Sequence, residues 1–202
     1  DTYTFSPSPA TMLLSGVMLK MGLYSIIRWI LPVVPEAVNE YGRIIMILAA
    51  VGVFYASAIA WLQKDLKRLF AYSSIAHVGL ITAGILTATE IGLQGSMLQM
   101  MAHGINVVGL FYVCQILFRK FGNHDINAMG GLRLNAPLFA GLYLVIMLAS
   151  VALPLTNAFP GEFMLLNAVY GVSPWICLFA GSGVILGAVY MFTSYQKVML
   201  GE

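Results

Sequence analysis

Four titratable side chains interrupt long apolar segments of this chain: Lys20, His77, His103 and Glu162. Lys20 lies in the run from Pro9 to Arg28, which is long enough to cross a bilayer, since a spanning helix needs about 20 predominantly apolar residues. An ammonium group in the middle of such a helix costs at least roughly 2.5–3.5 kcal/mol on insertion scales. Burial disfavours the charged forms of lysine and glutamate, and histidine titrates near neutral pH, so groups of these types can exchange protons. Their pattern indicates proton or ion movement within a membrane.

Smaller polar residues accompany these four. In the predicted helix over residues 91–119, Ser96, Gln99, His103 and Asn106 recur at intervals of three, four and three, and therefore share one face. A polar stripe on a spanning helix must face the bundle interior or a water-filled path. We therefore predict a proton relay through Lys20, His77, His103 and Glu162, supported by the polar residues Ser73, Ser74, Gln99, Asn106, Thr156 and Asn157.

A structural role is the alternative for each residue taken singly. An intramembrane histidine near serine or glutamine is often a hydrogen-bond strut between helices, worth about 0.6 kcal/mol on average. Glu162 could accept from free backbone donors, and Lys20 could pair with a neighbouring carbonyl. Four such groups at similar depths, on four different spans, favour the relay.

The composition is typical of a polytopic α-helical membrane protein. Hydrophobic residues make up 60% of the 202 residues and charged residues only 9%, whereas soluble domains carry about 25% charged residues. The apolar runs are continuous and of helical length, unlike the alternating strands of a β-barrel. Cys114 and Cys177 lie in separate apolar runs without CxxC spacing, so they cannot assemble an iron–sulfur or zinc ligand set. We predict no metal or cofactor site on this chain.

We predict an all-α fold with six transmembrane spans, the fifth of them broken. The spans cover about residues 10–33, 41–62, 66–88, 91–119, 136–171 and 174–198. In the fifth, Pro154, Pro160 and Gly161 fall within eight residues, and each proline lacks an amide donor and clashes with the preceding turn. This span should therefore break and resume at about 161–171, with Glu162 at the restart.

Basic residues predict the orientation. One end of the spans collects Lys64, Lys67, Arg68, Arg119, Lys120, Arg133 and Lys197, against Arg28 and Arg43 at the other end. Short loops rich in lysine and arginine stay in the cytoplasm. We expect a multi-pass protein of the bacterial inner (plasma) membrane, with both termini and the Gln63–Arg68 and Phe121–Asn135 loops on the cytoplasmic side. Because the sequence starts at Asp1 and stops directly after a span, residues 1–202 are expected to be a single transmembrane module from a longer subunit.

Several stretches strongly resemble the antiporter-like membrane subunits of respiratory complex I. They are Asp65-Leu-Lys-Arg-Leu-Phe-Ala-Tyr-Ser-Ser-Ile-Ala-His77-Val-Gly, Gln99-Met-Met-Ala-His103-Gly, the Gly130-Gly131-Leu132 turn, and Leu153-Pro154…Gly161-Glu162-Phe163. The Gly-Glu-Phe sequence looks like the M-type (chain-four) branch, because some sister subunits carry a lysine in place of this glutamate. The resemblance covers essentially the whole chain.

This resemblance implies an inverted repeat of five helices, each repeat with a broken helix that forms a half-channel. The chain would be the second repeat, preceded by the last helix of the first. By resemblance, Lys20 would connect the two half-channels, His77 and His103 would form the central relay, and Glu162 would end the second half-channel.

The function that the resemblance implies is that of a non-redox, proton-translocating subunit of NADH:quinone oxidoreductase, coupled to electron transfer elsewhere. NADH, FMN, iron–sulfur clusters and quinone would belong to other subunits. The implied partners are other membrane subunits of complex I, the lipid bilayer, protons and internal water, and no nucleic acid. One alternative is a subunit of a multisubunit cation/proton antiporter. Another is a haem b carrier ligated by His77 and His103, which leaves Lys20 and Glu162 unexplained. A purely structural scaffold is the third.

Overall fold

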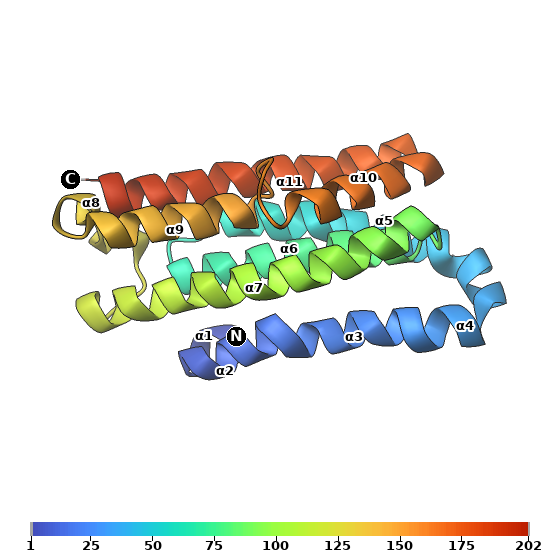
Figure 1. The fold of residues 1–202 in the computed structure, drawn as a ribbon, viewed down its shortest axis with the longest axis horizontal. Helices are drawn as coiled ribbons and strands as arrows, with labels where there is room; N and C mark the ends of the chain where they lie inside the picture. Colours follow the sequence, from blue (N-terminus) through green and yellow to red (C-terminus); the bar gives the residue numbers. More distant parts are fainter. Residues whose placement is uncertain (1, 202) are drawn as a thin grey trace.

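The structure, a computed structural model, describes residues 2–201, and its long helices lie side by side along one axis (Figure 1). After the short α1 (Thr2–Phe5), the first long segment is one nearly continuous helix. It consists of α2 (Ser8–Leu13), a π-helical turn (Leu14–Met18), α3 (Leu19–Ser25), a second π-helical turn (Ile26–Ile30) and α4 (Leu31–Val33). π-Helical turns widen a helix locally and are frequent at functional sites. Lys20 follows the first of them.

The second long helix, α5 (Pro35–Trp61), starts earlier than predicted. Residues 35–40 include Glu36, Asn39 and Glu40, so they lie outside the apolar run that set the predicted start at about 41. Pro35 occupies the first helical turn, where its missing amide hydrogen needs no partner. The predicted boundary was wrong because an apolar run marks the membrane-embedded part of a helix, not its end.

Local capping groups set the ends of the next two helices, α6 (Leu66–Ile85) and α7 (Glu90–Phe121). The Asp65 side chain accepts a hydrogen bond from the Arg68 amide at the start of α6, and Thr89 does the same for Gly92 at the start of α7. α7 ends at Gly122, whose φ of 74° is readily adopted only by glycine. The following connection contains η3 (Ile126–Ala128) and α8 (Leu132–Asn135).

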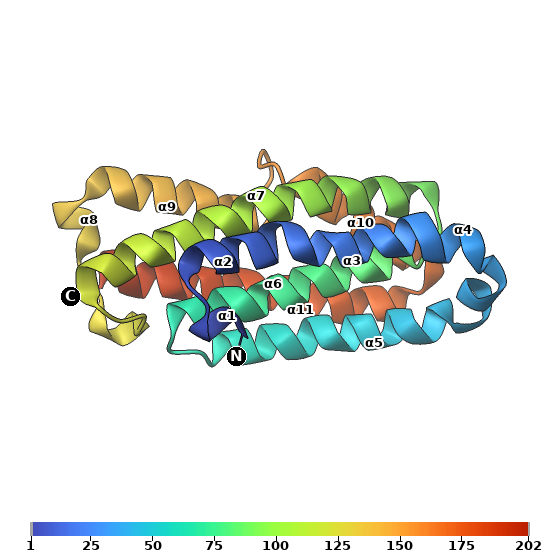
Figure 2. The ribbon, with the colours of Figure 1, turned by 90° about the horizontal axis from the view of Figure 1, so that it is seen from below.

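The fifth segment is interrupted about midway along the bundle (Figures 1 and 2). It consists of α9 (Pro137–Ser150) and α10 (Phe159–Val172). We expected the chain to be non-helical up to Gly161, and this detail was wrong. Pro160 lies inside the first turn of α10, where proline is tolerated, and the Glu162 amide donates to the Ala158 carbonyl over 3.0 Å. The last helix, α11 (Pro174–Tyr195), continues into a π-helical turn (Gln196–Leu200).

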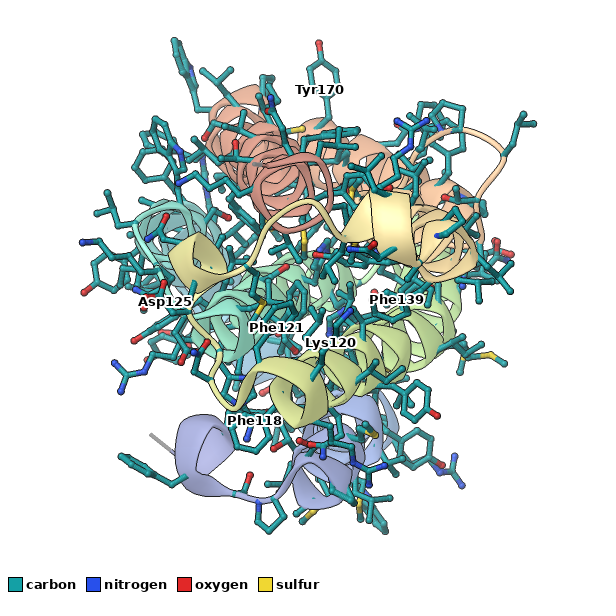
Figure 3. The ribbon with its side chains drawn as sticks, turned by 90° about the vertical axis from the view of Figure 1, so that its left-hand side faces the viewer. Phe118, Lys120, Phe121, Asp125, Phe139 and Tyr170 are labelled. Carbon is teal, nitrogen blue, oxygen red and sulfur yellow. The ribbon has the colours of Figure 1, made fainter. Side chains whose placement is uncertain are left out.

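Four helical segments within residues 2–201 are long and apolar enough to cross a membrane: Ser8–Val33, Pro35–Trp61, Glu90–Phe121 and Pro174–Leu200. The predicted basic residues gather at the bundle end that Figure 3 faces, where Lys120 and Asp125 are labelled. The chain is therefore a multi-pass helical membrane protein with one strongly basic end.

The buried apolar side chains form two main clusters, one toward each end of the bundle. The cluster at the basic end includes Phe70, Phe111 and Tyr143. The cluster at the opposite end includes Met46, Ile81, Leu165 and Ile176. The polar residues of the predicted relay lie between the two clusters along the helices, so the apolar core is divided by a polar layer at mid-depth.

Candidate functional site

The polar layer begins at Lys20 on α3. The Lys20 ammonium donates to the Ser15 carbonyl over 2.5 Å, and the Ser15 hydroxyl shares a hydrogen bond of 2.8 Å with the Ser74 hydroxyl on α6. Ser15 and Ser74 are both fully enclosed. A pair of hydroxyl groups thus joins the first long segment to α6.

Glycines let α7 approach the first segment at the level of Lys20. A Cβ atom on Gly104 would lie only 3.1 Å from the Gly16 carbonyl oxygen and 3.9 Å from Cε of Lys20. Gly104 directly follows His103, so this close contact brings the histidine to the depth of the two serines.

His103 continues the series and meets His77. Its Nε2 lies 3.0 Å from the Ser74 hydroxyl, and the centres of the His77 and His103 rings are 5.2 Å apart. Because the rings lie against each other, a porphyrin cannot stand between them, and the haem b alternative would require α6 and α7 to separate.

Glu162 follows His77. Its Oε2 lies 3.9 Å from Nδ1 of His77 and 3.4 Å from Nε2 of Gln99, and the residue is only 4% exposed. The carboxyl group stands in the first turn of α10, where the helix dipole favours negative charge.

Close backbone packing holds Glu162 in this place. A Cβ atom on Gly161 would lie 2.8 Å from the Gln99 amide nitrogen, and one on Gly95 would lie 3.2 Å from the Gly161 carbonyl oxygen. The start of α10 therefore lies directly on α7, and side chains larger than hydrogen are excluded at both glycines.

The structure thus brings all four predicted titratable residues into one series of neighbours. In order, it runs through Lys20, Ser15, Ser74, His103, His77, Glu162 and Gln99. Hydroxyl and imidazole groups can each donate and accept a hydrogen bond. Hydrogen bonds join the Ser15, Ser74 and His103 side chains directly. Lys20 meets the Ser15 backbone carbonyl, and His77 lies 3.9 Å from Glu162, a distance that suits a bridging water.

The other predicted polar residues lie beside this series. Asn106 and Asn157 form two hydrogen bonds with each other, of 3.1 and 3.2 Å, and Asn106 also donates to the Ala149 carbonyl. They tie the interruption between α9 and α10 to α7. The Thr156 hydroxyl donates to the Leu153 carbonyl in its own turn, and Ser73 interacts with the hydroxyl of Tyr190.

Sequence reasoning missed Ser15, Ser57 and Tyr190. Ser15 supplies both contacts that connect Lys20 to α6, while Ser57 and Tyr190 border a cavity next to His77 and Glu162. A small hydroxyl residue in an apolar helix carries no periodic signal, and the π-helical turn that contains Ser15 is not visible in the sequence. The signal available was the spacing of five residues between Ser15 and Lys20.

Contacting titratable groups inside a helical membrane bundle are typical of ion- or proton-translocating membrane proteins. Residues 1–187 match the family described as "NADH:quinone oxidoreductase/Mrp antiporter, TM". The chain belongs to this family.

Curated relatives match the sequence over the full length of the chain. It is 40% identical over 202 residues to NADH-quinone oxidoreductase subunit M of Rickettsia prowazekii, and 33% identical to the subunit of that name from Escherichia coli. The matches cover 100% of this chain but only 41% and 40% of those relatives. The chain therefore spans about two-fifths of their length.

Solved structures show the same fold. A chain of respiratory complex I from Thermus thermophilus with bound NADH is 33% identical, with a TM-score of 0.92, over 97% of this chain and 42% of that one. A chain of the Mrp complex from Dietzia, at 20% identity and a TM-score of 0.89, covers 96% of this chain and 36% of its own. This second likeness concerns the fold alone.

Proposed function

We propose that this chain is part of a proton-translocating membrane subunit of NADH:quinone oxidoreductase and that protons move along its polar layer. The observation that carries the proposal is the series of neighbouring groups from Lys20 to Glu162, which spans four helical segments. The relatives named as subunit M support the assignment to this complex.

In this proposal each titratable residue has a distinct role. Lys20 exchanges protons with the part of the subunit that precedes this chain, His77 and His103 form the central relay, and Glu162 is the terminal group. Gln99 holds the Glu162 carboxyl, Ser74 bridges to His103, and Asn106 with Asn157 keeps the interrupted segment against α7. Ser73 and Thr156 support the layer from its edges.

The proposed topology has six spans, with α6 and the interrupted α9–α10 segment crossing the membrane as well as the four long helices. The residues form one module, the second inverted repeat with the helix that precedes it. The gathering of lysine and arginine at one end supports placing that end, with both termini, on the cytoplasmic side of a bacterial inner membrane.

Redox chemistry belongs to other subunits in this proposal, since NADH, FMN, iron–sulfur clusters and quinone would all bind elsewhere in the complex. The neighbouring membrane subunits, lipid, protons and internal water are the proposed partners of this chain. The second candidate function is that of a subunit in a cation/proton antiporter, which the family description and the fold of the Mrp complex favour.

The test is Glu162→Gln in the full-length subunit within its assembled complex, reconstituted into vesicles. The amide keeps the size and one acceptor oxygen but cannot titrate, so NADH-driven proton translocation should fall while the amount of assembled complex stays constant. Glu162→Asp should retain part of the activity, because the carboxyl group survives about one methylene short of its partners.

Glu90→Gln is the matched control. Glu90 is an exposed residue at the start of α7, and its carboxylate accepts a hydrogen bond from the nearby Gln94. It should translocate protons normally. If Glu162→Gln also translocates protons normally, or if both Glu162 variants fail because the complex does not assemble, Glu162 is structural and the proposed relay is wrong.

A further inference from the structure

The His77 and Glu162 side chains border a small cavity, with room for about one water molecule, which we call the site cavity. Ser57 of α5 and Tyr190 of α11 also line it. The Ser57 hydroxyl is fully buried and has no hydrogen-bond partner among residues 2–201. Buried polar groups are normally hydrogen-bonded, so this hydroxyl marks the site cavity as a place that binds water.

A second small cavity, with room for a few water molecules, lies at the basic end of the bundle, and we call it the basic-end cavity. Its polar lining comes from the ends of α5 and α11 and from the connection after α7: Gln63, Lys64, Asn127, Thr193, Ser194 and Lys197. Tyr190 is the residue that lines both cavities.

The two cavities follow each other along the same pair of helices. On α5 the site cavity is lined by Ser57 and the basic-end cavity by Trp61, one turn further on. On α11 the step from Tyr190 to Ser194 is also one turn, about 5.4 Å. The linings of the two cavities are therefore about one helical turn apart along these helices, and Tyr190 lies at the boundary because it lines both.

The hydroxyl of Tyr190 is directed toward the site. It interacts with the Ser73 side chain, and a Cβ atom on Gly187, another residue of the site cavity, would lie 3.6 Å from it. Tyr190 is only 2% exposed, so its ring is packed among other side chains at the boundary between the two cavities. A phenol hydroxyl both donates and accepts a hydrogen bond, so it can pass a proton while still excluding bulk water.

We propose that Tyr190 relays protons between the His77–Glu162 site and the membrane face that carries Lys64 and Lys197, through the two cavities. The proposal rests on the proposed function of the layer and adds an exchange route with one identified face. The ammonium groups of Lys64 and Lys197 repel a stationary cation such as sodium. The neutral groups of the basic-end cavity can hold the waters along which a proton moves.

The first experiment compares Tyr190→Phe with Tyr195→Phe in the full-length subunit, assembled in its complex and reconstituted into vesicles. Tyr195 is the matched control, because it lies on the same helix, lines neither cavity and donates its hydroxyl to the Ala140 carbonyl. Tyr190→Phe should lower proton translocation about tenfold, equivalent to about 1.4 kcal/mol in the transfer step, without loss of assembled complex. Tyr195→Phe should leave it unchanged. Normal translocation by Tyr190→Phe overturns the proposal.

The second experiment measures the passage directly and does not depend on pumping. The Ser57→Cys substitution is made in a full-length subunit whose other cysteines, including Cys114 and Cys177, are replaced by serine. A membrane-impermeant methanethiosulfonate is then added on the side of the membrane that carries Lys64 and Lys197. Labelling should be slow with Tyr190 present and at least about tenfold faster when Tyr190→Ala is added, because the side chain that separates the cavities is gone. Thr193→Cys, in the basic-end cavity, should label rapidly in both backgrounds.

If Tyr190→Ala does not accelerate labelling of Ser57→Cys while Thr193→Cys labels normally, the cavities are not connected and the proposal is wrong. That result leaves the proposed function of the layer to be decided by the Glu162 variants, so the two failures are distinguishable.

Discussion

Ser74 is the point at which the layer is most easily broken without removing a titratable group. Its hydroxyl is the contact between Ser15, 2.8 Å away, and Nε2 of His103, 3.0 Å away, and the residue is 1% exposed. Ser74→Ala removes this hydroxyl and adds no bulk. We expect proton translocation to fall sharply, because the branch that holds Lys20 would no longer contact the histidines.

The magnitude follows from the two lost hydrogen bonds. Leaving a buried polar group without its partner costs about 1–3 kcal/mol. If one such loss appears in the barrier of the transfer step, that step slows by about 5- to 150-fold. The loss of the other partner should appear as reduced stability of the subunit, by a similar about 1–3 kcal/mol.

The assay is NADH-driven proton translocation per assembled complex in vesicles. Ser74→Thr should retain much of the activity, because the hydroxyl is kept. The matched control is Thr82→Ala on the same helix, since the Thr82 hydroxyl donates to the Val78 carbonyl one turn earlier in its own helix. Full translocation by Ser74→Ala, or an equal loss in Thr82→Ala, would refute the reasoning that Ser74 carries the connection.

Three further predictions concern Lys20 and Gly161 in the layer and His124 outside it. Lys20→Ala should reduce proton translocation while the subunit still assembles. Lys20→Arg should not restore translocation, because a guanidinium does not release its proton at accessible pH. Normal translocation by both variants would exclude a relay role for Lys20. Gly161→Ala should lower the stability of the complex by about 1–3 kcal/mol, because the added methyl group meets the Gln99 backbone. At Gly171 an added Cβ atom would meet open space, so Gly171→Ala should leave the stability unchanged. Equal stabilities of the two variants would contradict the packing argument. Outside the spans, burial lowers the pKa of His124 below its ordinary value of 6.5, Lys67 adds to this and Asp65 opposes it. The neutral ring is then favoured in the folded state, so its contribution to the free energy of unfolding is complete above about pH 6.5 and is lost as the pH falls through the lowered pKa. In unfolding scans from about pH 7.5 to 5, His124→Gln should therefore lose less stability on acidification than the unmodified protein. Identical profiles would contradict this.

The sequence alone was sufficient to predict the helical segments, because each depends on local properties. A continuous apolar run forms a helix in a membrane whatever surrounds it, since its backbone groups must bond within the segment. The interruption of the fifth segment was equally local, because Pro154 cannot take part in a helix interior. The shared depth of Lys20, His77 and His103 followed from counting residues along each helix.

Only the tertiary structure decided which of these groups meet. Ser15 and Ser74 are 59 residues apart in the chain, and their hydrogen bond depends on how two helices pack. That packing is set by close backbone contacts such as Gly16 with Gly104, which a sequence pattern does not pair.

Tyr190 shows the limit most clearly. From the sequence it is one more aromatic residue in an apolar helix, indistinguishable from Tyr195 a little further on. In the fold Tyr195 reaches the Ala140 carbonyl, whereas Tyr190 stands between two cavities beside Glu162. Helix formation depends on neighbours along the chain, but the surroundings of a side chain depend on the rotation and spacing of whole helices, which only the packed bundle determines.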